Sequence, residues 1–372
     1  MTPIPVTILT GFLGAGKTTI LNDILRDPAF AETAVLINEF GDVQVDHDLV
    51  AEFSDELVMT TTGCLCCTAS SDIKQSLFEL WRQRKDRKIG PFRRVIVETT
   101  GLMDPVPIIN SLLSPPAPGL VDTIVTNQFA LARMITLFDV INGPDTLSGH
   151  DEAVRQIALG DVVVLTKTDI LEPSGRADAL AKRQQQIAAI NPGAPILERQ
   201  TDVDGLKNLL LSAGTYDLRT KGEDANAWLA LERLTHAHDH DHSGHDHPGH
   251  GHHDHDHDHD HDHDHGHHHH DHNRHGDDVR SNVITVDKPI SPLQLQMFID
   301  TLKLNAGTNL LRLKGLIALK NDPDRPVVVH GVQHLIHPID QLESWPSDDR
   351  RTKIVLIGKN LDVAVFRQVL AD

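Results

Sequence analysis

Residues 6–18 read Val-Thr-Ile-Leu-Thr-Gly-Phe-Leu-Gly-Ala-Gly-Lys-Thr, and this stretch decides the fold. An apolar run, Val6–Thr10, is followed by Gly, four further residues, Gly, Lys and Thr, and then by a helix-like segment. Strand, glycine-rich loop and helix in that order are the context in which this spacing forms a phosphate-binding loop. The glycines let backbone N–H groups surround phosphates, and the helix N-terminus adds partial positive charge. We therefore predict a nucleotide site here.

Each residue of this loop has an expected role. Lys17 should neutralise the β- and γ-phosphates and take part in catalysis, and the Thr18 hydroxyl should bind Mg²⁺. The other positions expected to contact the nucleotide are Gly11, Gly14, Ala15, Gly16 and Thr19.

Working outward from the loop, residues 1–215 alternate short apolar runs with longer polar-apolar stretches. The runs are continuous, as in strands buried on both faces, so we predict an α/β fold with a parallel, doubly wound sheet. Further expected strands are Ala34–Ile37, Val95–Val97, Ile135–Phe138 and Val162–Leu165. Expected helices include Thr18–Arg26, Asp72–Lys85 and Gly175–Ile190.

Another phosphate-side segment follows the run Val95–Val97. Glu98 ends this strand, where P-loop proteins often carry an acid near Mg²⁺, and we predict a catalytic role for it. Gly101 comes three residues later and could approach the γ-phosphate through its backbone.

The segment Thr166-Lys167-Thr168-Asp169 follows a buried strand and indicates which base is bound. It is similar to the Asn-Lys-x-Asp segment that reads guanine. The Asp169 carboxylate can accept from guanine N1–H and from the exocyclic amine, whereas adenine offers neither in that arrangement. Lys167 would lay its aliphatic stem over the base. Thr166 replaces the usual Asn and cannot make the same amide contact. We predict GTP as the nucleotide.

The three cysteines of the chain, Cys64, Cys66 and Cys67, lie within four positions after Gly63. A cluster so short does not form a disulfide framework, and in a reducing compartment it indicates a metal site. Three thiolates suit Zn²⁺ or Cu⁺ and leave one tetrahedral position open, as a carrier requires. The alternative is that these are ordinary buried cysteines.

A third segment, Asn38–Asp48, follows the second expected strand, where nucleotide switches sense the γ-phosphate. Glu39, Asp42 and His47 could each reach Mg²⁺ or complete the metal site, and each could equally be a solvated loop residue. Glu39 is the strongest of the three, and we predict both catalytic and metal-binding roles for it.

Composition restricts the partners. The net charge is −19, so a nucleic acid is not an expected partner. No apolar run reaches the 18 residues of a membrane span, and the first residues lack a signal-peptide pattern. We expect a cytoplasmic protein that does not enter membranes.

Residues 236–275 contain 21 of the 26 histidines, interleaved with aspartate. Neither face of this pattern is apolar, so we predict a disordered linker over residues 216–280. Residues 281–372 should form a smaller α+β domain. Its expected strands are Val283–Val286 and Ile354–Ile357, and its expected helices are Pro292–Leu304 and Leu361–Leu370.

Together these segments resemble the CobW-like GTPases. The resemblance covers nearly the whole chain except the histidine tract. It rests on the phosphate loop, Asn38-Glu39-Phe40-Gly41, the Cys-x-Cys-Cys loop, Glu98-Thr99-Thr100-Gly101, the Thr-Lys-Thr-Asp segment, Leu310-Leu311-Arg312-Leu313-Lys314-Gly315, Gln333, Trp345 and Ile354-Val355-Leu356-Ile357-Gly358. The resemblance implies GTP hydrolysis coupled to metal delivery, as in the zinc-regulated GTPase metalloprotein activators.

The expected function is therefore a GTP-hydrolysing metallochaperone that transfers zinc to a client apo-metalloprotein. Two alternatives remain. The histidine tract favours a zinc store whose nucleotide is only regulatory. A cobalt-directed factor in cobalamin synthesis is the other, although sulfur ligands argue mildly against cobalt.

Overall fold

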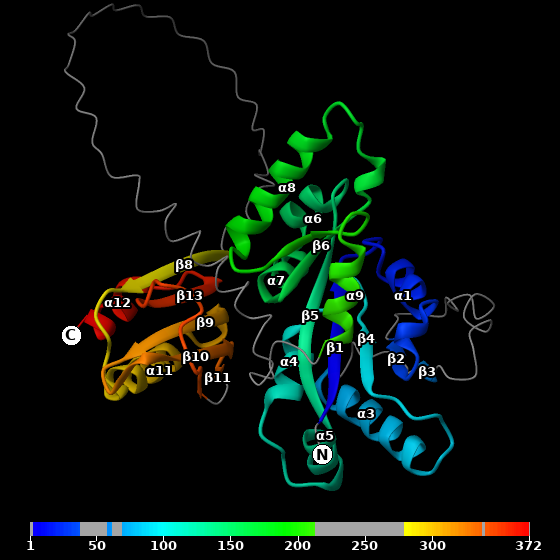
Figure 1. The fold of residues 1–372 in the computed structure, drawn as a ribbon, viewed down its shortest axis with the longest axis horizontal. Helices are drawn as coiled ribbons and strands as arrows, with labels where there is room; N and C mark the ends of the chain where they lie inside the picture. Colours follow the sequence, from blue (N-terminus) through cyan, green and yellow to red (C-terminus); the bar gives the residue numbers. More distant parts are fainter. Residues whose placement is uncertain (1–2, 38–57, 62–68, 213–278, 337–338, 372) are drawn as a thin grey trace, which may run out of the picture.

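The computed structural model describes residues 3–37, 58–61, 69–212, 279–336 and 339–371. Its N-terminal part is built on a parallel sheet of seven strands in the order β3-β2-β4-β1-β5-β6-β7 (Figure 1). The strands are β1 Ile4–Gly11, β2 Thr33–Ile37, β3 Val58–Thr61, β4 Arg94–Glu98, β5 Phe129–Asp139, β6 Val162–Thr166 and β7 Ile196–Glu198. The predicted doubly wound α/β sheet is confirmed. β3 and β7 were not predicted, because runs of three or four residues give too little pattern.

Helices cover both faces of this sheet. They are α1 Lys17–Leu25, α3 Ala69–Lys85, α4 Val106–Leu113, α5 Leu120–Gln128, α6 Gly143–Gly149, α7 Asp151–Leu159, α8 Arg176–Ile190 and α9 Val203–Leu211. Alternate residues of one strand enter different cores. Leu9 packs with α1 and α9, whereas Ile8 packs with α3, α4 and α7. Both side chains are fully buried, which is why the strands are continuously apolar in the sequence.

The strand order places the candidate site. The chain adds strands on one side of β1 as far as β4 and then crosses to β5 on the other side. The loops that follow β4 and β1 therefore lie beside each other at the carboxyl ends of the strands, where parallel sheets bind ligands.

The C-terminal part is an antiparallel sheet with two helices on one face, which confirms the predicted α+β class. Its elements are β8 Val279–Val286, α11 Pro292–Ala306, β9 Leu310–Leu319, β10 Asp322–Val332, β11 Leu335–Ile336, β12 Asp340–Gln341, β13 Thr352–Lys359 and α12 Val363–Ala371. Ser291 and Gln294 form a capping box that begins α11. The hairpin of β9 and β10 was not predicted.

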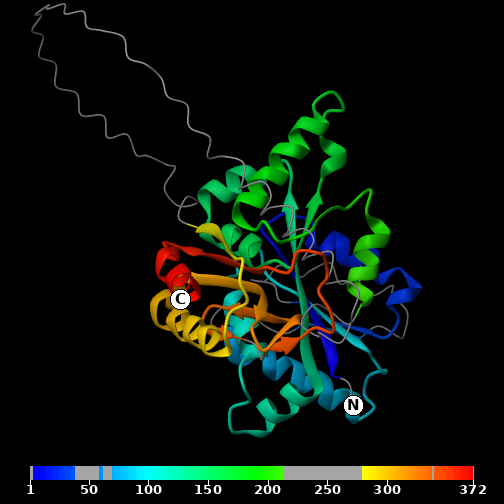
Figure 2. The same ribbon diagram turned by 60° about the vertical axis from the view of Figure 1, so that its left-hand side comes forward.

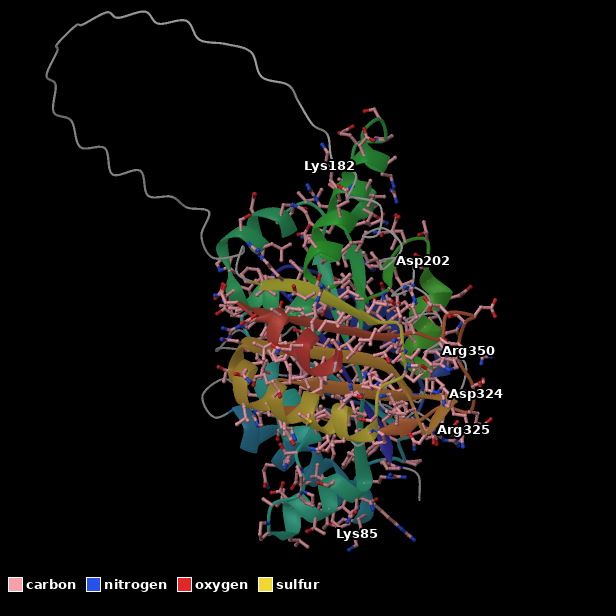
Figure 3. All side chains as sticks on the ribbon, turned by 90° about the vertical axis from the view of Figure 1, so that its left-hand side faces the viewer. Lys85, Lys182, Asp202, Asp324, Arg325 and Arg350 are labelled. Atoms are coloured by element: carbon pink, nitrogen blue, oxygen red, sulfur yellow. The ribbon has the colours of Figure 1, made fainter. Side chains whose placement is uncertain are left out.

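The second face of this antiparallel sheet packs against the N-terminal part (Figures 1 and 2). Leu316, Val328 and Val355 belong to the same apolar core as Val154 and Ile157 of α7. Charged side chains such as Arg350 and Asp324 instead project at the edge of the molecule (Figure 3). Among the described residues, no helix combines the length and apolar character needed to cross a bilayer.

Candidate functional site

The loop between β1 and α1 has the geometry predicted for phosphate binding. Gly14 and Gly16 have φ angles of 74° and 89°, in the left-handed region that glycine adopts without strain. The Lys17 ammonium donates to the carbonyl oxygens of Gly11, at 2.8 Å, and Phe12, at 3.1 Å. The loop thus curls around a buried cation, as a phosphate cradle requires. Ala15 is buried beneath the loop, and Thr19 is exposed in the first turn of α1.

Thr18 and Glu98 are brought together from positions 80 residues apart. The Thr18 hydroxyl donates to Glu98 Oε1 at 2.8 Å, and the Glu98 side chain is buried at the end of β4. A hydroxyl and a carboxylate are hard oxygen donors of the type that Mg²⁺ prefers. The residues present therefore fit the predicted Mg²⁺ position beside the loop.

Gly101 lies directly against the phosphate loop. A Cβ atom at this position would stand 2.4 Å from the backbone nitrogen of Leu13, so only glycine permits the approach. The segment before it is tied to β1, because Thr99 N–H donates to Leu9 O at 3.0 Å and Thr99 Oγ1 donates to Thr10 Oγ1 at 2.9 Å. The loop after β4 thus has the placement expected of a γ-phosphate contact.

The Thr166–Asp169 segment is connected to the phosphate loop by its first residue. The Thr166 hydroxyl donates to Ala15 O at 2.9 Å and lies 3.3 Å from Phe138 O. A threonine can therefore tie the base segment to the phosphate loop. Lys167 has a positive φ of 59°, and its ammonium donates to Asp139 at 2.7 Å.

Asp139 and Gln200 are candidate site residues that the sequence reading missed. Burial opposes ionisation of Asp139, but hydrogen bonds from Lys167 and Asn142 lower the pKa of its carboxyl group. Gln200 Nε2 donates to Asp169 Oδ1 at 2.6 Å, in the segment after β7. Asp139 ends the buried strand β5 at the sheet's carboxyl edge, and that position was the available signal. No local pattern marks Gln200.

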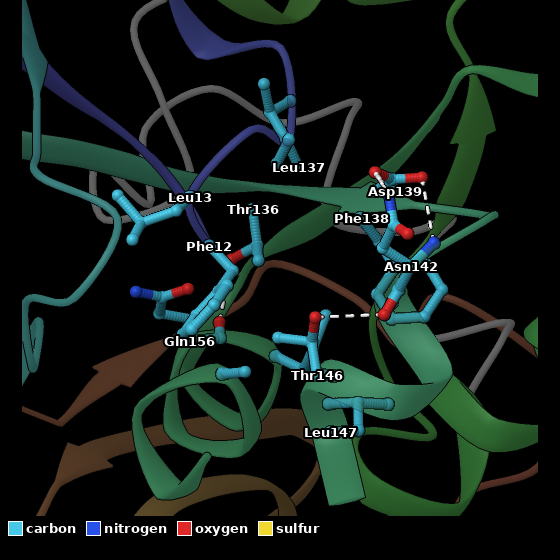
Figure 4. Close-up of a pocket in the computed structure, with 14 residues that line it drawn as sticks. Phe12, Leu13, Thr136, Leu137, Phe138, Asp139, Asn142, Thr146, Leu147 and Gln156 are labelled. Atoms are coloured by element: carbon cyan, nitrogen blue, oxygen red, sulfur yellow. Dashed lines mark hydrogen bonds between the residues drawn. The ribbon is translucent and has the colours of Figure 1, made fainter. Parts of the chain in front are cut away.

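A pocket adjoins the phosphate loop on the side of α6 and α7 (Figure 4). Its lining includes Phe12 and Leu13 from the loop, Asp139 from β5 and Gln156 from α7. Asn142 donates from Nδ2 to Asp139 Oδ2 at 2.9 Å. The carboxylate that holds Lys167 is therefore part of this pocket wall.

The predicted thiolate and switch ligands lie outside the described residues. These are Glu39, Asp42, His47, Cys64, Cys66 and Cys67. The strands that precede them are described, and Ile37 of β2 pairs with Thr61 of β3 and with Glu98 of β4. Both strands therefore end at the level of Glu98. Within the described ranges, no three His, Cys, Asp or Glu side chains are grouped closely enough to bind a metal ion.

Residues 5–198 match the CobW/HypB/UreG nucleotide-binding domain, and residues 279–372 match the C-terminal domain of the cobalamin synthesis protein CobW. The chain belongs to the CobW/HypB/UreG family. The family's nucleotide-binding domain thus contains the phosphate loop, Glu98 and the Thr166–Asp169 segment.

Individual CobW-family proteins are similar over different lengths. The zinc chaperone YjiA of Escherichia coli is 28% identical over 371 residues, covering 100% of this chain and 99% of that protein. Zinc-regulated GTPase metalloprotein activator 1 of Schizosaccharomyces pombe is 34% identical over 203 residues, covering 53% of this chain and 46% of that protein. The crystal structure of Zn(II)-bound YjiA GTPase from E. coli superposes with a TM-score of 0.66 at 23% identity, with both chains fully covered. That likeness supports the CobW-family fold.

Proposed function

We propose that this chain is a GTPase that binds zinc through Cys64, Cys66 and Cys67 and transfers it to a client metalloprotein. The main support is that β2, β3 and β4 end at the same height in the sheet. Ile37, Thr61 and Glu98 are paired across the sheet, so Glu39 and the cysteine loop follow strands that end beside the Thr18–Glu98 pair.

The phosphate chemistry is assigned to three side chains. Lys17 would neutralise the β- and γ-phosphates, and Thr18 with Glu98 would hold Mg²⁺, which supplies charge neutralisation as the γ-phosphoryl group is transferred to water. Gly101 would contact the γ-phosphate through its backbone. Glu39 would sense that phosphate.

Guanine recognition is assigned to the segment after β6. Asp169 would accept from both donors on the guanine edge, and Lys167 would cover the base, with its ammonium held by Asp139. The contact between Thr166 and Ala15 supports this assignment, because it sets the distance between base segment and phosphate loop. Exchange of guanine for adenine would leave the Asp169 carboxylate without its donors.

Zinc is the cargo. Cysteine sulfur is a soft ligand that suits Zn²⁺, and three thiolates leave a coordination position through which a client could take the ion. Thiols must stay reduced for this purpose, which fits a cytoplasmic setting. Zinc also appears in the names of the E. coli and S. pombe relatives.

The coupling between the two sites is reciprocal. If GTP orders the segments after β2 and β3, it tightens zinc binding, and zinc must tighten GTP binding by the same factor. A hundredfold effect would correspond to about 2.7 kcal/mol. Hydrolysis removes the γ-phosphate contact and loosens the ion when a client is docked.

Metal transfer is the decisive measurement. The zinc-loaded chain would be mixed with apo-metalloproteins in the presence of GTP, GDP or a non-hydrolysable GTP analogue. Transfer should be fastest with GTP, and the Cys64→Ser, Cys66→Ser, Cys67→Ser variant should transfer none. Equal rates of zinc transfer with all three nucleotides would contradict the coupled mechanism.

A second candidate function, zinc storage, is favoured by the 21 histidines in residues 236–275. Neutral imidazole binds zinc, but a long tract must lose conformational entropy around each ion, so its sites should be weaker than the cysteine site. Deletion of these residues should lower the number of bound ions and leave GTPase activity intact. A store would instead lose its whole function with the tract.

A further inference from the structure

Helix α7 connects the loop after β4 with the C-terminal sheet, to which its first residue, Asp151, is also bound by the Lys359 ammonium of β13 at 2.8 Å. Gln156 is buried, and its side-chain amide donates to Gly101 O at 3.0 Å and to Met103 O at 3.1 Å. The adjacent Arg155 donates to Asp104 Oδ2 at 2.5 Å. Two adjacent residues of α7 therefore bind the loop after β4 through hydrogen bonds to Gly101, Met103 and Asp104.

The carboxyl end of α7 is bound to the C-terminal sheet through Arg312. Arg312 of β9 donates to Leu159 O in the last turn of α7 and pairs with Asp161 just after the helix. Asp161 in turn accepts from Met134 N–H of β5 at 2.8 Å. Arg312 and Asp161 are 3% and 4% exposed, so this is a fully desolvated ion pair between the two domains.

The part of the chain between these two sets of contacts is itself held by neighbouring elements of the N-terminal part. Asn191, at the end of α8, donates from Nδ2 to Ile157 O at 2.8 Å and to Gly160 O at 2.9 Å. A Cβ at Gly160 would lie 2.7 Å from Thr136 Oγ1, so the chain there is closely packed on β5. The carboxyl end of α7 is therefore packed as one unit with α8 and β5, so a displacement of the Gly101 loop would reach the Arg312 contact through closely packed groups.

We infer that α7 transmits the state of the γ-phosphate to the C-terminal domain, with Gln156 as the positioning residue at one end and Arg312 at the other. The inference rests on the proposed GTPase function. When Gly101 moves onto a γ-phosphate, its carbonyl moves with it, and Gln156 follows through its hydrogen bond. The C-terminal sheet follows through Arg312, so GTP and GDP favour different placements of that sheet. Zinc delivery could then be timed by the C-terminal domain as well as by the metal site.

Thermodynamic reciprocity gives a readout that a merely structural role would not move. If the contacts between the C-terminal sheet and α7 favour the GTP-bound state, weakening those contacts must change the affinity for GTP relative to the affinity for GDP. Gln156→Met and Arg312→Met should each reduce the ratio of GTP to GDP affinity by about tenfold, with GDP affinity within about twofold of the original protein. Because the two act through one helix, the double variant should lose less than the product of the single losses.

Matched controls are available in the same chain. Gln186→Met changes an exposed glutamine of α8, and Arg350→Met changes an exposed arginine that pairs with Asp324. Both should leave the ratio unchanged. If Arg312→Met fails to fold, Arg312→Lys takes its place. Lysine retains the charge, so this variant should reduce the ratio of GTP to GDP affinity by less than the tenfold expected of Arg312→Met.

Hydrogen exchange of the unmodified full-length chain provides a test without any variant. A non-hydrolysable GTP analogue, compared with GDP, should change amide protection in residues 151–161 and 310–316. Equal protection with both nucleotides, or a folded Arg312→Met protein with an unaltered GTP to GDP ratio, overturns the inference while leaving the GTPase proposal in place. A chain that binds neither nucleotide overturns the proposed function itself and the inference with it.

Discussion

The Thr166 hydroxyl donates a hydrogen bond to the carbonyl oxygen of Ala15, at 2.9 Å. Both residues are buried, and the bond joins the end of β6 to the phosphate loop before α1. The bond sets the distance between the phosphate loop and the Thr166–Asp169 segment, to which we assign guanine recognition. Threonine thus ties the two segments without the amide that usually stands at this position.

Thr166→Val should weaken GTP binding without unfolding the protein. Valine has almost the same shape but cannot donate, so Ala15 O loses its partner. A lost hydrogen bond of this kind costs about 1 kcal/mol, roughly a fivefold loss of affinity. Isothermal titration with GTP measures it, and Thr166→Ser, which keeps the hydroxyl, serves as the control. Unchanged affinity in the valine variant would show that the bond does not position the base segment.

Lys17→Ala should abolish GTP hydrolysis. The variant removes the cation at the centre of the phosphate loop, which nothing nearby in the loop can replace. Phosphate release would be measured with Mg²⁺, and thermal unfolding would establish that the variant is folded. A rate equal to that of the original protein would remove the loop from the mechanism.

Asp169→Asn should reduce the preference for GTP over ATP by at least about tenfold, because an amide cannot accept from both guanine donors. The same variant should gain affinity for xanthosine triphosphate, whose carbonyl replaces the exocyclic amine. Competition binding with the three nucleotides provides both measurements. Equal affinity of the unaltered protein for GTP and ATP would contradict the guanine assignment.

Replacement of Cys64, Cys66 and Cys67 by serine should remove one tightly bound zinc ion and leave GTP binding in place. Because thiols lose protons on binding zinc, the affinity of the original site should fall as the pH is lowered. Chelator competition measures the tight site. X-ray absorption without sulfur neighbours around zinc would falsify the assignment.

Acid should weaken the junction between the two domains. Burial tends to raise the pKa of Asp161, but Arg312 and Lys314 lower it below its ordinary value of 3.8. A lowered folded-state pKa contributes stability above the unfolded-state pKa, and that stability is lost as pH falls through the lower value. The free energy of unfolding should therefore decrease below about pH 4. Denaturant titrations at neutral and acid pH measure it.

The Asp161→Asn variant isolates this contribution. It leaves a buried guanidinium without its counter-charge, so it should lose about 3–5 kcal/mol at neutral pH. Its stability should also depend less on pH. Asp324→Asn breaks an exposed pair with Arg350 and should change little. Parallel pH profiles for Asp161→Asn and the original protein would contradict the assignment.

The sequence predicted the parts of the fold whose signal is local. Val6–Thr10 and Val162–Leu165 lie within β1 and β6, because a strand buried on both faces must be continuously apolar. Thr18 lies in α1 just after β1, and Glu98 ends the neighbouring strand β4, so two residues that the sequence placed separately near Mg²⁺ meet at one edge of the sheet. By contrast, Gln156, Gln200 and Arg312 act on partners that only the tertiary structure brings near. An isolated glutamine or arginine in a sequence does not indicate which distant carbonyl or carboxylate it will meet.

The desolvated pair of Arg312 and Asp161 has a consequence for how the gene can be divided. Between α9, which ends at Leu211, and β8, which begins at Val279, 67 residues intervene. Among the described residues, side chains on either side of that interval join the two sheets, with Arg312 of β9 paired to Asp161 before β6. Lengthening such a connection carries only a logarithmic entropic cost, about 0.6 kcal/mol per doubling. Two separately translated polypeptides, covering residues 1–212 and 279–372, should therefore associate into one particle.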